Sequence, residues 1–220
     1  MSRFEITSCP VRPIYTWEDI PVLYAEARLP HWAGKGGKHF NRYYLACERT
    51  FERYCAQELY PQAESTCRQA VENAGALPQW HASLLPTVTR ETPDLLSLYI
   101  DTVETDGIHR TVLRRGDTWD LRRGLPAALS DFFPAHTPWR RRLLEQAAQE
   151  IEAQETQGIA LYHKDWRRKL HSAFHSHHFY LTEKGLCFFY QMYAIAPAVE
   201  GTPTFCLPYD SEQGPFPALP

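Results

Sequence analysis

Histidine is the residue type whose spacing suggests chemistry most strongly in this sequence. Four of the ten histidines fall close together, at His171, His175, His177 and His178. Two imidazoles four residues apart share one helix face, as helical zinc ligands do. The glutamate of the H-E-x-x-H hydrolase motif is absent, because Ser172 follows His171. We favour a surface cluster that is partly protonated near neutral pH. The alternative is a metal site in a hydrolase that acts on glycans or peptides.

A glycine-rich segment is the second candidate. Residues 34–38, Gly-Lys-Gly-Gly-Lys, precede a predicted helix, where free backbone amides attract phosphate. His39 and Phe40 stand where a P-loop beginning at Gly34 requires glycine and lysine, so an ordinary helix entry is the better interpretation. The sequence has no nucleophile elbow, no dinucleotide-binding turn and no nucleophilic-cysteine signature. We therefore predict a non-enzymatic protein with no cofactor, although a triad assembled from distant positions would leave no local signature.

The six cysteines do not suggest a disulfide framework. Cys47 and Cys55 lie eight residues apart on one predicted helix, roughly 12 Å along its axis, which is too far for a disulfide. Both lie on its apolar stripe, so we predict reduced core thiols, as in a cytosolic protein. The other cysteines are Cys9, Cys67, Cys187 and Cys206. None forms a C-x-x-C pair with another, so structural zinc has little support.

One long helix dominates the first half of the chain. From Lys38, apolar residues recur at intervals of three and four up to Ala74, and Gly75 follows. Pro61 interrupts this run and cannot donate to the carbonyl four residues back, so we expect a kink or a restart there. Before the helix, residues 22–27 are predicted to form a strand.

Hairpins dominate the second half. Residues 95–105 and 108–113 flank Asp106-Gly107, a dipeptide that tolerates the positive φ angles of a two-residue turn. Residues 179–182 and 186–190 form a second predicted hairpin. Further elements are predicted at 126–133, 138–158, 165–174 and 204–207. The sequence therefore predicts an α+β fold, in which an antiparallel sheet packs against a long amphipathic helix with additional short helices.

Composition narrows the class of protein. With 220 residues, of which 44% are hydrophobic and 13% aromatic, the chain can fold around one large core. A net charge of −3 argues against nucleic-acid binding. We find no secretory signal and no apolar run long enough to insert in a membrane, so we expect a cytoplasmic protein. We predict one domain over residues 1–209, followed by a flexible proline-rich tail at 210–220.

The C-terminal segments resemble a known family. Residues 179–186 (FYLTEKGL), 193–201 (YAIAPAVEG) and 205–209 (FCLPY) are similar to the closing motif of the RsiV-like domain. That domain is the extracytoplasmic, lysozyme-sensing part of certain anti-sigma factors, and it also occurs as a domain of unknown function in many Gram-positive bacteria. Trp119-Asp120-Leu121 and Asn41-Arg42-Tyr43-Tyr44 extend the resemblance upstream. Residues 1–90 resemble the companion domain of some peptidoglycan deacetylases, and residues 91–209 the RsiV-like segment.

The resemblance implies a binding domain without catalytic residues, whose ligand is a protein or is derived from the cell wall. The loop from Tyr193 to Gly201 combines an aromatic residue, Pro197 with its fixed φ, and a flexible glycine, which suits an exposed binding edge. Trp32, beside glycines in a loop, is the best surface candidate among the tryptophans. We further expect the C-terminal hairpin to pack against the long helix in a single core.

Overall fold

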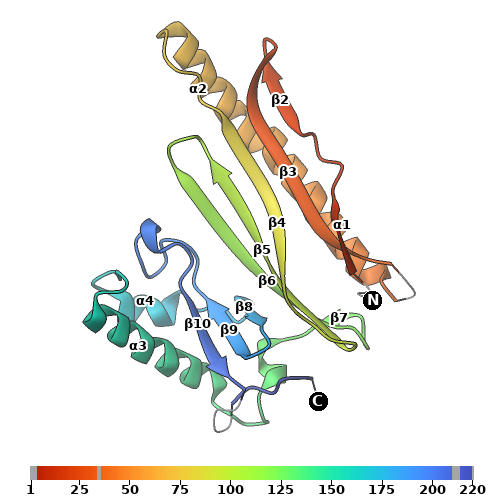
Figure 1. Ribbon diagram of the computed structural model, residues 1–220, viewed down its shortest axis with the longest axis vertical. Helices are drawn as coiled ribbons and strands as arrows, with labels where there is room; N and C mark the ends of the chain where they lie inside the picture. The colour runs from red at the N-terminus through yellow and green to blue at the C-terminus, as the bar shows by residue number, and fades with distance from the viewer. Residues whose placement is uncertain (1–3, 34–35, 210–213, 220) are drawn as a thin grey trace. The chain divides into compact units, whose positions relative to one another are not determined.

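The computed structural model describes residues 4–33, 36–209 and 214–219. It has the predicted α+β architecture, with a large, mainly antiparallel sheet, a long helix and shorter helices (Figure 1). The elements are β1 (Phe4–Ser8), β2 (Ile14–Trp17), β3 (Ile20–Trp32), α1 (Lys38–Tyr54), the π-helical segment η1 (Cys55–Leu59), α2 (Tyr60–Glu72), β4 (Trp80–Glu91), β5 (Leu95–Thr105), β6 (Arg110–Asp120), β7 (Leu125–Pro126), η2 (Leu129–Phe132), α3 (Trp139–Gln157), α4 (Trp166–Ser172), β8 (Phe179–Leu181), β9 (Gly185–Phe189), η3 (Ala198–Glu200) and β10 (Thr204–Pro208).

The chain divides into two compact units. Unit 1 consists of the residues up to Pro86 together with 101–111, and unit 2 consists of 87–100 together with the residues from Val112 onward. Strands β4, β5 and β6 contribute residues to both units. The large sheet has the strand order β1-β3-β4-β5-β6-β7, with β2 paired to β3. Whether the two units fold cooperatively as one domain, as we expect from the sequence, stays a prediction.

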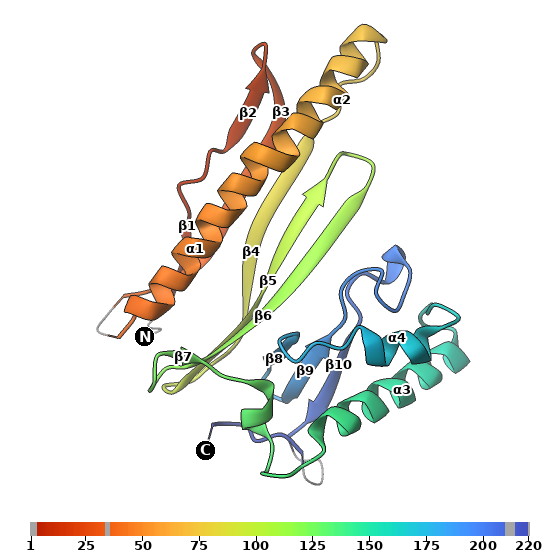
Figure 2. The ribbon, with the colours of Figure 1, turned by 180° about the vertical axis from the view of Figure 1, so that it is seen from behind.

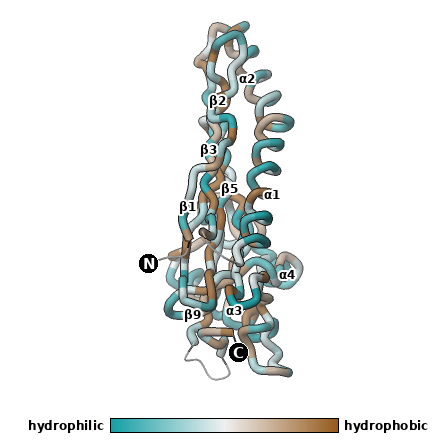
Figure 3. The backbone as a smooth tube through the Cα atoms, turned by 90° about the vertical axis from the view of Figure 1, so that its right-hand side faces the viewer, coloured by the Kyte–Doolittle hydropathy of each residue, from teal (hydrophilic) through white to brown (hydrophobic). Residues whose placement is uncertain are grey.

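In unit 1, the long helix covers the sheet with one apolar face. Hydrophobic and hydrophilic residues alternate around its turns (Figure 3), and Phe40, Phe51 and Cys67 are among those that are buried. The π-helical segment η1 separates α1 from α2, and Pro61 occupies the first turn of α2. The backbone stays helical throughout, since the N–H of Tyr60 donates to the carbonyl of Cys55, five residues back. The irregularity predicted near Pro61 is therefore a π-helical segment within one long helix, and the helix does not restart there.

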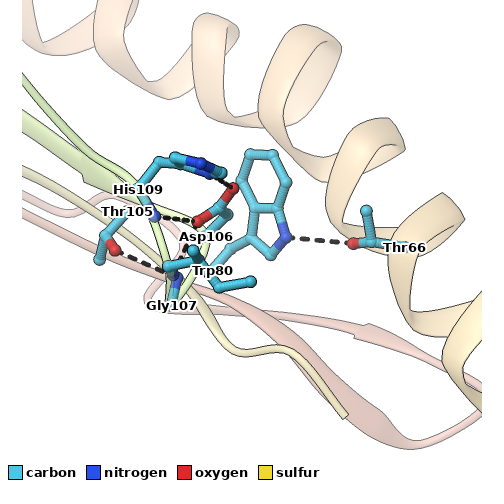
Figure 4. A network of polar contacts seen from close by, with 7 residues as sticks. Thr66, Trp80, Thr105, Asp106, Gly107 and His109 are labelled. Carbon is cyan, nitrogen blue, oxygen red and sulfur yellow. Dashed lines mark hydrogen bonds and ion pairs between the residues drawn. The ribbon is translucent and has the colours of Figure 1, made fainter. Parts of the chain in front are cut away.

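The turn between β5 and β6 is longer than predicted. It spans residues 106–109, and Asp106 Oδ1 accepts hydrogen bonds from the backbone N–H groups of Ile108 and His109, at 2.8 and 2.6 Å (Figure 4). Asp106 Oδ2 lies 3.0 Å from Nδ1 of His109. These contacts hold the pKa of the Asp106 carboxyl well below its usual range. An aspartate that binds its own backbone in this way replaces the two-residue turn.

Unit 2 has its own core, and here one expectation is wrong. The C-terminal hairpin packs with α3 and α4 rather than with the long helix, since Phe188 of β9 shares a buried cluster with Leu143 of α3 and Trp166 of α4. Strand β5 joins this core through Ser97, which is fully buried. Its Oγ accepts a 2.8 Å hydrogen bond from the N–H of Leu181 in β8.

The described part of the C-terminal tail has neither helix nor strand, as predicted. It is nevertheless packed, because Gly214 and Pro215 are buried and the N–H of Phe216 donates to the carbonyl of Phe132. Among the helices within the described ranges, none is long and apolar enough to cross a membrane.

Candidate functional site: two adjoining loops

The loop between β9 and β10 brings three of the predicted binding residues together. Tyr193 is 57% exposed and has a φ of 68°. A left-handed conformation is unfavourable for tyrosine, and such strain clusters at functional positions. Pro197 immediately precedes η3, and Gly201 follows it with a φ of 63°. The sequence therefore identified a real loop with unusual backbone geometry.

A second loop, at residues 158–163, is fixed against the first. The N–H of Leu161 donates to Oε1 of Glu200 at 2.9 Å, and the N–H of His163 donates to the carbonyl of Ile195 at 3.0 Å. Nε2 of His163 also lies 3.2 Å from the carbonyl oxygen of Tyr193. Residues 158–163 and 193–201 thus form one structure, which we call the loop pair (Figures 1 and 2).

The loop pair exposes several large apolar side chains. Val199 is 79% exposed, Ile159 67% and Leu161 62%, in addition to Tyr193. Single exposed apolar residues are ordinary, but a group gathered on two joined loops is typical of an interaction site. Ile159 and Leu161 were not among the binding residues predicted from the sequence. Their signal was available, because two large aliphatic residues follow the helix-ending Gly158.

A disulfide ties the strands on either side of the 193–201 loop. Cys187 of β9 and Cys206 of β10 are direct cross-strand partners and are bonded to each other. The sequence analysis did not predict this pair, because strand register was not visible in it. Cys47 and Cys55 form no disulfide, as predicted. With Ile195 and Ala196 also buried, the loop is anchored at its base.

Tyr162 is the ionisable residue of the loop pair whose hydrogen bond ties the loop to helix α3. Tyr162 donates a hydrogen bond to Oε1 of Gln154 at 2.6 Å. Burial, followed by the nearby carboxylates of Glu200, Glu150 and Glu155, raises the pKa of Tyr162 to about 12. Its phenol therefore stays protonated at neutral pH, far from the range of an effective general base.

The four histidines of the predicted cluster do not come together as a set of metal ligands in the described residues. His171 lies on α4, whereas His175 and His178 follow it with ring centroids 4.9 Å apart. His178 stacks on Phe189, and burial, followed by the charges of His175 and His177, lowers the pKa of His178 to about 4. Within residues 4–33, 36–209 and 214–219, no group of three or more histidine, cysteine, aspartate or glutamate side chains is arranged to hold a metal ion. The hydrolase alternative gains no support.

Trp32, the fourth predicted binding residue, is buried, so its assignment to the surface is wrong. It is 6% exposed and packs on Phe4 and Phe40, with ring centroids 5.4 and 5.9 Å away. The side chain of Asn41 bonds both backbone polar groups of Trp32. A Cβ atom on Gly37 would lie 2.9 Å from the carbonyl oxygen of Trp32, so this glycine permits close packing. Gly34 and Lys35 lie outside the described residues.

The loop pair lies within a segment that is similar to a known protein family. Residues 130–210 match DUF3298, a protein family of unknown function. A crystal structure of a DUF3298 family member from Bacteroides fragilis is 17% identical, with a TM-score of 0.67, and the match covers 94% of this chain and 90% of that one. A DUF3298 family protein from Pseudomonas aeruginosa is 16% identical, with a TM-score of 0.58 and the same coverages.

The search of curated proteins finds no match. At these identities the two crystal structures establish the fold alone. Residues 130–210, which include α3, α4, the small sheet and the loop pair, match the DUF3298 family, and the chain has the fold of the two DUF3298 crystal structures.

Proposed function

We propose that this chain is a non-enzymatic binding domain that engages a protein ligand through the loop pair. The observation that carries the proposal is the exposure of Ile159, Leu161, Tyr193 and Val199 on two loops that hydrogen-bond to each other. A preorganised apolar surface loses little conformational entropy on binding, which favours affinity. Aromatic anchors such as Tyr193 often contribute much of the binding energy at protein interfaces.

The resemblance to the lysozyme-sensing domain supplies the first ligand to test. The 193–201 loop carries one of the three segments that resemble that family's closing motif, and it is the same loop that presents Tyr193 and Val199. A cell-wall fragment is the second ligand class. Both classes occur outside the cytoplasm.

The disulfide between Cys187 and Cys206 favours work in an oxidising compartment, where such bonds persist. We therefore propose an extracytoplasmic setting, in place of the cytoplasmic one expected from the sequence. The proposal can be checked by alkylating the protein's thiols in cells of the source organism. We expect Cys187 and Cys206 to resist alkylation until a reductant is added.

The direct test is a titration of the purified chain with lysozyme and, separately, with soluble peptidoglycan fragments, followed by calorimetry. We expect saturable binding of lysozyme. The double variant Tyr193→Ala/Val199→Ser should weaken it by at least tenfold, since it removes about 1.4 kcal/mol or more of contact energy. The matched control is Ile108→Ser, because Ile108 is 86% exposed but stands on the separate turn of unit 1.

Two outcomes would remove the proposal. One is equal binding by the native chain and the double variant, which would place the contact elsewhere. The other is the absence of binding to both lysozyme and peptidoglycan fragments, which would end the sensing hypothesis.

A further inference from the structure

A groove lies between the first half of α3 and the helix α4. Its volume is about 930 Å³, and none of the residues of the loop pair lines it. Small-molecule sites commonly measure roughly 300–1,000 Å³. This groove therefore has the size of a ligand site and is separate from the proposed protein-binding surface.

The floor of the groove is apolar. Leu144 from α3 and Trp166 and Leu170 from α4 form it, and each is buried. Trp139, at the start of α3, borders the groove and is partly exposed. Because the floor is recessed between two helices, a flat membrane surface would not reach it, whereas a slender apolar chain or a single ring would.

The rim of the groove is cationic. Arg141 and Arg167 line it, and each has a carboxylate partner, Glu145 at 2.7 Å and Glu152 at 2.9 Å. Arg140 also lines it, but within the described part of the chain it has no carboxylate partner. The first turn of α3 contains no acidic residue, so the positive end of the helix dipole adds to the charge of the rim.

Arg140 is placed to receive an anionic group. One of its terminal nitrogens donates to the carbonyl of His171 at 3.4 Å, and its guanidinium lies over the ring of Phe174, 5.4 Å from the centroid. These two contacts hold the side chain beside the groove. A guanidinium has five N–H donors, so most of them remain for a carboxylate or a phosphate, which arginine binds in a bidentate manner.

We propose that this groove binds a small, free amphiphile, with its apolar part on the floor and its carboxylate or phosphate on Arg140. The apolar floor selects against simple inorganic anions, and the cationic rim selects against neutral and cationic amphiphiles. The ligand class is therefore a monomeric, singly headed anionic amphiphile, such as a fatty acid or a lysophospholipid with an acidic head.

Calorimetry with sodium dodecanoate, kept below its micelle concentration, tests this site. We expect one molecule to bind per chain, with dodecan-1-ol and inorganic phosphate binding at least tenfold more weakly. Arg140→Gln should weaken dodecanoate binding by tenfold or more. The matched control is Arg110→Gln, an exposed arginine on β6 in unit 1, which should leave binding unchanged. Ala148→Leu, which fills the groove from α3, should abolish binding while the thermal unfolding midpoint stays near that of the native chain.

Each of the following results would overturn the proposal. Binding of dodecan-1-ol as tight as that of dodecanoate would show that the cationic rim does not contribute to affinity. The Arg140→Gln variant could bind dodecanoate as well as the native chain does. The protein could bind vesicles of phosphatidylglycerol but no monomeric dodecanoate, which would make the face a membrane contact. Sedimentation could show a dimer that Ala148→Leu dissociates, in which case a second copy fills the groove.

Discussion

The two units expose apolar residues in different ways. In unit 1, the turn at 106–109 presents Ile108 alone, on a backbone held by the carboxylate of Asp106. In unit 2, the loop pair presents four large apolar side chains, and the bonds that shape it run between loops that are distant in sequence. The first arrangement closes a hairpin locally. The second requires tertiary structure to assemble a surface, and that added organisation is the reason we propose it as the binding surface.

The largest effect is expected from Trp32→Ala in unit 1. Removing a buried tryptophan should lower the free energy of unfolding by about 3–5 kcal/mol, measured by urea titration. Hydrogen exchange should report where the loss occurs. If the amides of unit 2 keep their protection against exchange, the two units unfold separately, and each can be assigned its own stability. Equal loss in both units would instead support the single cooperative domain predicted from the sequence.

Removing the disulfide should have the next largest effect. Cys187→Ser/Cys206→Ser opens a loop closed across a sequence separation of 19 residues, which should cost about 3 kcal/mol. The expected result is a lower thermal unfolding midpoint, and reductant should shift the native chain in the same direction but leave the variant unchanged. If reductant left the thermal unfolding midpoint of the native chain unchanged, the disulfide would not stabilise the fold as predicted. Cys55→Ser is unsuitable as a control because Cys55 is buried, so the partly exposed Cys47→Ser is preferable.

Acidification should destabilise unit 2 through His178. Its pKa is lowered to about 4 in the folded chain, so the unfolded chain takes up a proton first as the pH falls. The contribution of His178 is therefore complete above the ordinary histidine pKa of about 6.5 and is lost progressively as the pH falls through about 4. Between pH 7 and pH 5 we expect a loss of roughly 1–2 kcal/mol, allowing for solvent screening. In urea titrations, His178→Gln should lose less stability over that interval than the native chain does.

The smallest effect is expected from Tyr193→Gly. Glycine adopts the left-handed backbone without strain, so the variant should gain up to about 1 kcal/mol of stability or stay unchanged. It should nevertheless lose affinity for lysozyme, because the aromatic anchor is gone. A stability gain together with unchanged affinity would show that Tyr193 is merely a strained loop residue, and would weaken the contrast between the units.

Local patterns were sufficient for most of the fold. The helical period from Lys38, the hairpin around Asp106-Gly107 and the helix ended by Gly158 each depend on neighbours in sequence, and all three appear in the structure. The turn at 106–109 was misjudged in length, because a side chain competes there with the backbone bonds. Strand β4 (Trp80–Glu91), which pairs in parallel with β3, was not predicted at all.

Less of the candidate site than of the fold could be predicted from the sequence. Tyr193, Pro197 and Gly201 were found because one loop holds them, whereas Ile159 and Leu161 join that loop only through tertiary hydrogen bonds. Trp32 and Tyr193 were both predicted to be surface aromatics, but Trp32 is buried and only Tyr193 is exposed. The pairing of Cys187 with Cys206 depends on strand register, which residue spacing does not reveal.

The buried hydroxyl of Ser97 limits how this protein can be divided. The segment that matches DUF3298 begins at residue 130, yet the amide of Leu181 inside it donates to a side chain more than thirty residues upstream of that boundary. Excising residues 130–210 would leave this donor without its acceptor, at a cost of about 1–3 kcal/mol. The segment that matches the family is therefore shorter than the part of the chain that supplies all of its hydrogen-bond partners.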